Sequence, residues 1–140
     1  MKKNICIILC LILIFCLCAC GAIHENIGTM DNAVINLDGQ SYYTKQELES
    51  ALEVVESKFK TWPGFVMNSI KVSYAGDDAS YCNEMSEDIV YDEALTFTSS
   101  FTTGENDWDG FSKNVTYENW NWYLARANGG QWHLVSWGVC

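Results

Sequence analysis

The chain opens on an apolar run that is too short to cross a membrane. Two lysines precede the run, which extends from Ile5 to Leu17, and the small residue Ala19 follows it. A positive start, an apolar centre and a small residue near a cut site make up an export signal. As a helix, residues 5–20 would cover roughly 24 Å of a hydrocarbon core about 30 Å thick. No second apolar run of this length follows, so we expect the rest of the chain to be exported.

The end of the run, Leu17-Cys18-Ala19-Cys20, resembles the lipobox of bacterial lipoproteins. In that family a diacylglyceryl group is attached to the last cysteine, whose thiolate is the nucleophile, and the signal is cut just before it. The resemblance implies a signal peptide over residues 1–19. It also implies a mature chain that is anchored through lipid on Cys20 at the extracytoplasmic face of the cell membrane. An ordinary signal peptide with release, or an uncleaved anchor, is the alternative.

The charge of the chain excludes one class of partner. The 140 residues carry 18 acidic and 8 basic side chains, for a net charge of −10. Two of the basic residues leave with the signal, so the mature protein is more acidic still. Such a surface cannot neutralise a phosphate backbone, which argues against nucleic acid. It is also repelled by anionic lipid headgroups, so the lipid on Cys20 has to provide the membrane attachment.

Residues 21–40 mix glycine, asparagine, aspartate and threonine with single apolar side chains. No hydrophobic period persists there, although Ile35 and Leu37 could form a short first strand. We therefore expect residues 20–43 to be the lipidated N-terminus and a tether. Residues 44–140 have the length of a single domain with one core.

The strongest helix signal opens this domain. Thr44 and Glu47 have the spacing of a capping box, and Tyr43 lies at the correct distance from Leu48 for a hydrophobic staple. The apolar face, with glutamates opposite it, comprises Leu48, Ala51, Leu52, Val55 and Phe59. The proline of the following Trp-Pro-Gly stretch disfavours helical geometry in the residue before it. The pattern predicts a helix over about residues 45–60.

Two strands are predicted after the helix. Residues 68–75 alternate between apolar and polar side chains, and residues 76–88 have the composition of a polar loop or short helix. A second strand of about ten residues has one apolar face, because Leu95, Phe97, Ser99 and Phe101 alternate with Thr96, Thr98, Ser100 and Thr102. A polar excursion over residues 104–114 comes next.

The closing segment, residues 115–139, predicts a long β-hairpin around Asn128-Gly129-Gly130. A two-residue Asn-Gly turn would pair Trp120 with Trp137, Trp122 with Val135, and Leu124 with His133. A three-residue turn would shift the register by one and exchange the faces of the second strand. The residues alone leave both registers open.

One amphipathic helix followed by antiparallel strands predicts an α+β fold, with the helix packed on a curved antiparallel sheet. The order resembles the cystatin-like cone of the nuclear-transport-factor-2-like superfamily. The closing segment, TYENWNWYLAR…GGQWHLVSWGV, resembles the C-terminal signature of an uncharacterised family of small Gram-positive lipoproteins. The resemblance covers residues 44–140. It implies a fold and no particular activity, since that fold hosts enzymes as well as plain binding domains.

Aromatic residues are the first candidates for a binding site. Trp120, Trp122, Trp132 and Trp137 lie in the closing segment. Such rings stack on sugars and other flat ligands, and they also fill small β cores. We favour the core interpretation, with Trp108 of the polar excursion as the exposed ring. The candidate binding residues are Trp108, Trp120, Trp122, His133 and Trp137.

His133 is the one histidine inside the predicted domain, because His24 lies in the predicted tether. In a superfamily enzyme of the lyase or isomerase type it would act as a general base beside Asp92 or Glu93, with Tyr91 as an oxyanion donor. No spacing supports this pairing. A half-buried structural histidine is the simpler interpretation, and the enzyme is kept as the alternative function.

The stretch from Glu105 to Gly110 partly matches a calcium loop, with Asp107 and Asp109 at alternating positions. Thr116 occupies the position where a bidentate glutamate should close the cage. We therefore expect a plain acidic turn, with no metal and no cofactor.

Two cysteines, Cys82 and Cys140, remain once the signal peptide is removed and Cys20 is acylated. An extracytoplasmic location permits a disulfide between them, and two free thiols are equally consistent with the sequence.

These features predict a lipid-anchored binding or accessory module of the cell envelope. Its partner would be an envelope protein, a glycan or a small ligand. The alternatives are the pocket enzyme described above and a purely structural envelope protein.

Lipidation can be tested directly. Metabolic labelling with a fatty-acid analogue should tag the wild-type chain and miss the Cys20→Ser variant, because only the cysteine thiol forms the thioether. Equal labelling of the two chains, read from a gel, would remove the lipoprotein assignment.

Overall fold

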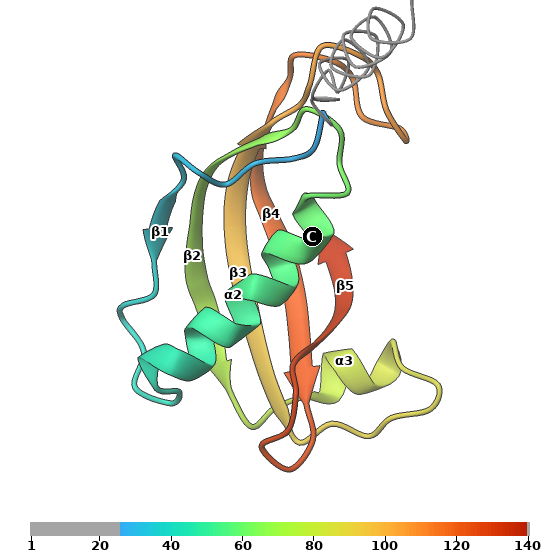
Figure 1. The fold of residues 1–140 in the computed structure, drawn as a ribbon. Coiled ribbons are helices and arrows are strands. Elements are labelled where there is room, and N and C mark those ends of the chain that lie inside the picture. The colour runs from blue at the N-terminus through green and yellow to red at the C-terminus, as the bar shows by residue number, and fades with distance from the viewer. Residues whose placement is uncertain (1–25, 140) are drawn as a thin grey trace, which may run out of the picture.

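The computed structural model describes residues 26–139, which form an α+β fold (Figure 1). The predicted signal peptide, the Cys20 lipidation site and Cys140 lie outside these residues. The described elements are β1 (Val34–Asn36), α2 (Lys45–Phe59), β2 (Val66–Gly76), α3 (Ser80–Glu84), β3 (Glu93–Thr102), β4 (Thr116–Arg126) and β5 (His133–Gly138).

The described strands form one open sheet in the order β1-β2-β3-β4-β5. β1 runs parallel to β2, and every other neighbouring pair is antiparallel. The sheet therefore has β1 at one edge and β5 at the other. The α+β class, with one main helix and a mostly antiparallel sheet, is confirmed.

α2 begins and ends where its sequence predicts. The Thr44 hydroxyl accepts a hydrogen bond from the Glu47 amide (3.3 Å), and the Glu47 carboxylate accepts one from the Thr44 amide (2.8 Å). This reciprocal pair is the predicted capping box. The buried side chains of the helix are Leu48, Ala51, Val55 and Phe59.

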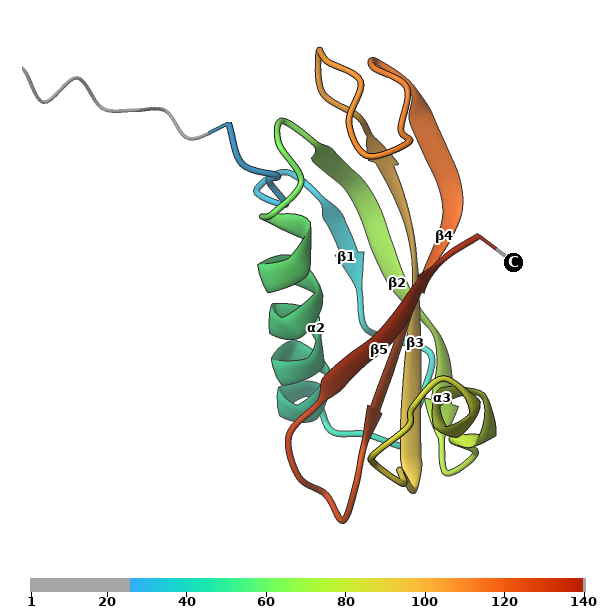
Figure 2. The ribbon, with the colours of Figure 1, turned by 90° about the vertical axis from the view of Figure 1, so that its right-hand side faces the viewer.

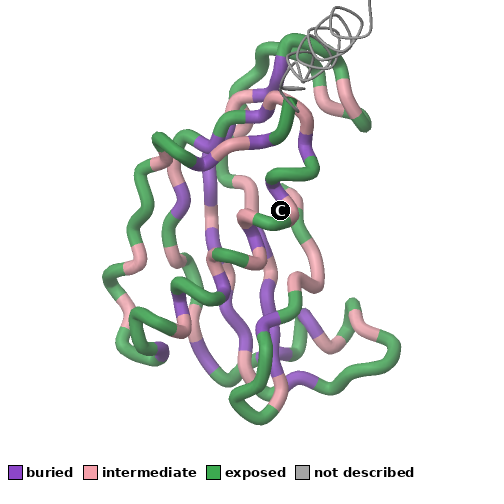
Figure 3. The backbone as a smooth tube through the Cα atoms, in the orientation of Figure 1, coloured by how far each residue is buried: buried purple, intermediate pink, exposed green. Residues whose placement is uncertain are grey.

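α2 covers one face of the sheet, which we call the inner face (Figure 2). The side chains that β3 was predicted to bury, Leu95, Phe97, Ser99 and Phe101, are all buried. Met67 and Ile70 of β2 and Trp122 and Leu124 of β4 join the same core. Figure 3 shows the buried residues gathered along the central strands. Each fully buried aliphatic or aromatic side chain contributes about 1.5–3 kcal/mol, so this layer is the main source of stability.

Residues 26–43, part of the predicted tether, pack onto the domain. Met30 and Tyr43 are buried in the core, Thr29 bridges to Val66, and β1 pairs with β2. A Cβ at Gly28 would overlap the carbonyl oxygen of Phe59, so the backbone runs close to the end of α2. The segment lacks a hydrophobic period because it contributes isolated side chains to the core.

The closing hairpin contains the predicted Asn-Gly turn. Asn128 and Gly129 have φ angles of 54° and 65°, both positive as a type I′ turn requires. The Gly130 amide donates to the Ala127 carbonyl (3.0 Å).

The strand register differs from the one that this turn predicts. The ladder starts with Ala125 opposite His133, one residue away from the two-residue register, and a bulge then brings Trp122 opposite Trp137. The pairing of Trp120 with Trp137, expected from the two-residue register, is therefore wrong, whereas the ladder beside the turn has the register of the three-residue alternative. Trp132 is the cause, because it leaves the ladder and packs, 7% exposed, against the core.

A buried ion cluster joins the helix to the sheet. Arg126 is only 7% exposed. Its Nε and Nη2 donate to the two carboxylate oxygens of Glu93 (2.7 and 3.0 Å), and Nη2 also donates to Glu47 (2.6 Å). The rings of Tyr43 and Trp132 lie 5.1 and 4.6 Å from the guanidinium carbon. The cluster connects the first turn of α2, the start of β3 and the end of β4.

This cluster shifts the titration of its members. The hydrogen bond from Arg126, with those from Thr44, lowers the pKa of Glu47 from 4.5 to about 2. Hydrogen bonding to Glu93 and Glu47 raises the pKa of Arg126 despite its burial. Burial raises the pKa of Tyr43, whose hydroxyl donates to the carbonyl oxygens of Gly76 and Ala94.

Glu47 should give the fold an acid-dependent stability. Its pKa is lowered by folding, so its contribution is complete above pH 4.5 and is lost as the pH falls towards about 2. In Glu47→Gln the free energy of unfolding, measured by urea denaturation, should fall less steeply over that window. Glu49→Gln, at an exposed ion pair with Lys45, is the control and should keep the wild-type slope. Identical slopes for wild type and Glu47→Gln would contradict the assignment.

Candidate ligand-binding face

The face of the sheet turned away from α2, the outer face, is the candidate site. Within residues 26–139, α3 and the residues that flank it pack on this face, at the end of the sheet near the β4–β5 connection (Figure 2). The rings of Tyr81 and Tyr123 lie 4.6 Å apart there. Beneath α3 a small cluster contains Ala79, Cys82, Tyr91, Ala94 and Ala125. The remainder of the outer face is open.

Hydroxyl and amide side chains line the open part of this face. Asn68 Nδ2 donates to Thr102 Oγ1 (3.1 Å), which is 3.0 Å from Thr116 Oγ1. Thr98 Oγ1 donates to Asn121 Oδ1 (2.6 Å). These bonds cross from β2 through β3 to β4. They hold the polar groups in defined orientations, and each hydroxyl keeps unused hydrogen-bonding capacity.

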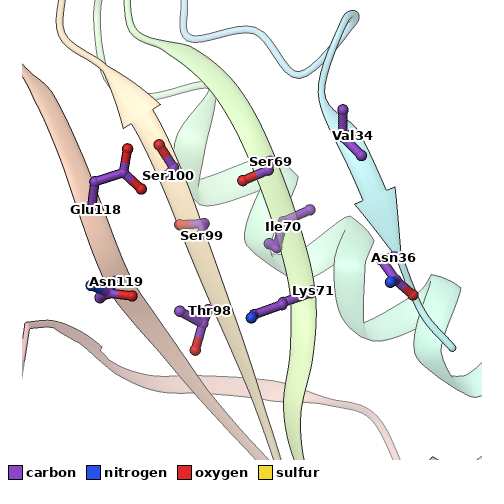
Figure 4. Close-up of a pocket in the computed structure, with 10 residues that line it drawn as sticks. All are labelled: Val34, Asn36, Ser69, Ile70, Lys71, Thr98, Ser99, Ser100, Glu118 and Asn119. Atoms are coloured by element: carbon purple, nitrogen blue, oxygen red, sulfur yellow. The ribbon is translucent and has the colours of Figure 1, made fainter. Parts of the chain in front are cut away.

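A depression of about 300 Å³ lies in the middle of the outer face (Figure 4). Its lining residues are Val34, Asn36, Ser69, Ile70, Lys71, Thr98, Ser99, Ser100, Glu118 and Asn119. Figure 4 shows Lys71, Thr98 and Asn119 on neighbouring strands around it, with α2 behind the sheet. The lining combines hydrogen-bond donors and acceptors with apolar surface, to which the exposed Val34 contributes.

A β-bulge forms one wall of this depression. The ladder between β3 and β4 shifts register between Ser99 and Phe101, so Glu118 and Asn119 together face Ser100. Asn119 has a φ of 56°, a left-handed conformation that asparagine tolerates better than most residues. The bulge brings two polar side chains to a place where a regular strand would present one.

A second depression, of about 200 Å³, lies further along β3 beside α3. Its walls include three tyrosines, Tyr74, Tyr81 and Tyr123. Ala94 and Thr96 of β3 line it, while Thr98 and Ser100 line the first depression. From Ala94 to Ser100 a strand covers roughly 20 Å. The two depressions therefore form a line along one strand.

The outer face is almost free of carboxylates. The five described strands contain only two acidic residues, Glu93 and Glu118, although the chain has 18. Glu93 is engaged by Arg126, and Glu118 lies across the first depression from Lys71. Asp78, from the β2–α3 connection, lines the second depression. A surface with few charged side chains and many hydroxyl and amide groups suits a ligand that is bound by hydrogen bonds.

The tryptophan candidates do not lie on this face. Trp122 is fully buried, and its Nε1 donates to Ser99. Trp120 packs against Trp62 and Phe101 in the core. Its buried Nε1 has no hydrogen-bond partner in the part of the chain that the structure describes.

Trp108 and Trp137 lie apart from one another. Trp108 is half-buried against Trp62 and Phe111, so the prediction of an exposed ring is wrong. The short Trp108–Phe111 bridge folds its loop back onto the core. Trp137 is 41% exposed, with Lys58 Nζ 4.3 Å from its ring centre.

His133 and its proposed partners occupy structural positions. The His133 side chain is exposed beside the ring of Tyr91 (centroids 5.9 Å) and lines neither depression. Glu93 is bound to Arg126. Asp92 accepts a hydrogen bond from the Asn128 amide (2.9 Å).

The acidic loop and the cysteine also have structural contacts. Asp107 accepts a hydrogen bond from the Lys113 amide (2.8 Å), as an acidic turn would. Within residues 26–139 no three histidine, cysteine or acidic side chains are placed to hold a metal ion. Cys82 is buried with its Sγ 3.8 Å from the Leu124 carbonyl oxygen, and burial raises the pKa of its thiol. The disulfide with Cys140 stays a prediction.

The sequence contained part of the signal for the outer face. The alternation of Thr96, Thr98, Ser100 and Thr102 with apolar residues predicts the polar side of a strand, but it does not indicate a site. The bulge at Glu118 and Asn119 has no local signal, and the face left open depends on where α2 and α3 pack.

Comparisons with known proteins give no match. No protein-family model, no curated protein and no solved structure matches the chain. None of the helices in the described part of the chain is long and apolar enough to span a membrane.

The bulge can be tested through Asn119. Alanine resists the left-handed conformation, so Asn119→Ala should lower the free energy of unfolding by about 1 kcal/mol. Asn119→Gly, which adopts this conformation freely, should stay within a few tenths of wild type. Urea denaturation measures both, and equal losses for the two variants would contradict the bulge geometry.

Proposed function

We propose that this chain is a lipid-anchored, extracytoplasmic binding module and that the outer face is its ligand-binding surface. The observation that carries the proposal is the pair of depressions aligned along β3 on an open, polar, carboxylate-poor face. A sheet face that serves only to keep a protein soluble usually carries many charged side chains. Here the hydroxyl and amide groups are instead ordered by hydrogen bonds between strands.

The amino-terminal sequence supports anchoring close to the membrane. The lipobox-like motif ends at Cys20, six residues before Asn26. Six residues reach at most about 20 Å when fully extended. Asn26 accepts a hydrogen bond from the Gly64 amide, and Gly64 lies beside the 104–114 loop. This end of the domain would therefore face the membrane, with the β4–β5 turn pointing away, so β3 would rise from the bilayer.

The fold supports a finer proposal. A single helix against one face of a bent, open sheet is consistent with the cystatin-like cone of the nuclear-transport-factor-2-like superfamily (Figure 1). We place the chain with the small Gram-positive lipoproteins that its closing segment resembles. In this chain the helix fills the inner side of the cone with the core, so the ligand surface is on the outside.

Two lysines test both location and binding. Lys71 lines the first depression, whereas the Lys45 side chain, on α2, is 81% exposed. A membrane-impermeant amine-acylating reagent should label Lys45 in intact expressing cells, because the domain lies outside the membrane. Lys71 should be protected in those cells and labelled in the purified full-length chain, because its ligand is then absent. Mass spectrometry of the tryptic peptides gives the labelled fraction of each lysine in cells and in the purified chain.

Each lysine has its own contrary outcome. Failure to label Lys45 in intact cells, with labelling after lysis, would contradict the extracytoplasmic location. Equal labelling of Lys71 in cells and in the purified chain would contradict an occupied outer face.

A further inference from the structure

The outer face also restricts the chemical class of its ligand, an inference that rests on the proposed function. We propose that the ligand is an uncharged oligosaccharide chain that lies along β3. One sugar ring stacks at the tyrosine depression, and the following sugars are hydrogen-bonded at the central depression.

The shape of the face favours an extended ligand. The two depressions are neighbours on β3. Thr96 lines one of them, and Thr98, the next residue on the same face of the strand, lines the other. Together they cover roughly 20 Å of strand. A compact small molecule would occupy one depression and leave the other empty, whereas a chain molecule contacts both.

The tyrosine depression provides a stacking platform. Tyr74 and Tyr81 are 40% and 41% exposed, and the Tyr81 ring lies against Tyr123 at an interplanar angle of 45°. The Tyr74 hydroxyl accepts from the Asp78 amide (3.2 Å), which fixes that ring. Fixed aromatic rings with an apolar face and a polar edge suit sugar rings, whose C–H faces and hydroxyl edges have the same character.

The central depression provides the hydrogen bonds. Ser69, Thr98 and Ser100 carry hydroxyls, and Asn36 and Asn119 carry amides. Hydroxyls donate and accept, and each amide does both through separate atoms. Sugar hydroxyls also donate and accept, so they complement such a lining.

A peptide strand is a poorer occupant. The backbones of β2, β3 and β4 are already paired on both sides within the sheet. The outer face therefore has no free ladder for an extended peptide to join.

Charge excludes ionic glycans. The chain carries a net charge of −10, which repels an acidic polymer at long range. At the site itself Lys71 and Glu118 have opposite charges on the same depression. Neither an acidic nor a basic glycan therefore gains a net electrostatic attraction there. A neutral sugar chain meets no such repulsion. Its hydroxyls exchange hydrogen bonds with water for hydrogen bonds with the protein, so little free energy is lost on dehydration.

The test measures binding of defined sugars to the full-length chain. The protein is held in polyoxyethylene detergent micelles, which lack sugar headgroups. The probes are neutral β-1,4-linked hexasaccharides of glucose, of N-acetylglucosamine and of mannose, with hexagalacturonate as the acidic comparator. Backbone amide shifts in NMR titrations give affinity and location. At least one neutral hexasaccharide should bind, with shifts concentrated on β3 and its neighbours, and hexagalacturonate should not.

Matched variants separate stacking from hydrogen bonding. Tyr81→Ala should weaken binding about threefold to tenfold, whereas Tyr81→Phe, which keeps the ring and loses only the hydroxyl, should weaken binding less than Tyr81→Ala does. Thr98→Val keeps the side-chain shape, removes the hydroxyl and should weaken binding by a similar factor. Trp137→Ala, an exposed aromatic residue away from the outer face, should have no effect. Amide spectra confirm that each variant is folded.

The outcomes distinguish this inference from the proposed function. If no neutral hexasaccharide binds while Lys71 is protected in cells, the sugar class is wrong and the binding face stands. If hexagalacturonate binds equally well, or if Tyr81→Ala and Thr98→Val both bind normally, the inference is also overturned. If Lys71 is unprotected and no sugar binds, both proposals fail.

Discussion

The ion cluster around Arg126 is the interaction on which the arrangement of the domain depends. A buried guanidinium group is stable only when partners neutralise its charge and satisfy its donors. Glu93 and Glu47 neutralise the charge and accept hydrogen bonds from Nε and Nη2, and the rings of Tyr43 and Trp132 lie against the group. These residues come from segments that are far apart in the chain. Their shared geometry therefore fixes how α2 lies across the sheet and where the ladder of the closing hairpin can start.

Holding α2 against one side makes the sheet two-faced. β3 shows this most clearly, since its inward side chains are buried and its outward threonines remain at the surface. Most of the large aromatic rings are packed on the inner face, where Trp62 contacts Phe101 and Trp122. The exposed aromatic surface of the outer face consists of tyrosines instead. A tyrosine at a surface keeps a hydroxyl in water and an apolar ring for contact, so this division matches a core on one side and recognition on the other.

The outer face and the amino terminus support one functional picture. A short lipid-anchored connection would hold the 104–114 end of the domain near the membrane, and α3, which carries Tyr81, lies at the opposite end of the sheet (Figure 1). A ligand aligned along β3 would then run outward from the bilayer, towards the extracellular material. Catalysis has less support, because Glu93 is bound to Arg126, Asp92 to the β4–β5 turn, and His133 is exposed on β5.

The sequence by itself determined the features whose interacting residues lie within a few positions of one another. The capping box needs only Thr44 and Glu47, and the two sides of β3 follow from the pleat of a single strand. Tertiary structure alone decided the features that need a distant partner. Met30 enters the core through segments it meets only after folding, Trp132 resets the hairpin register, and Ser100 faces a bulge from another strand. The physical reason is that periodicity records which side a residue takes, whereas the identity of its neighbour across the sheet is set by packing of the whole chain.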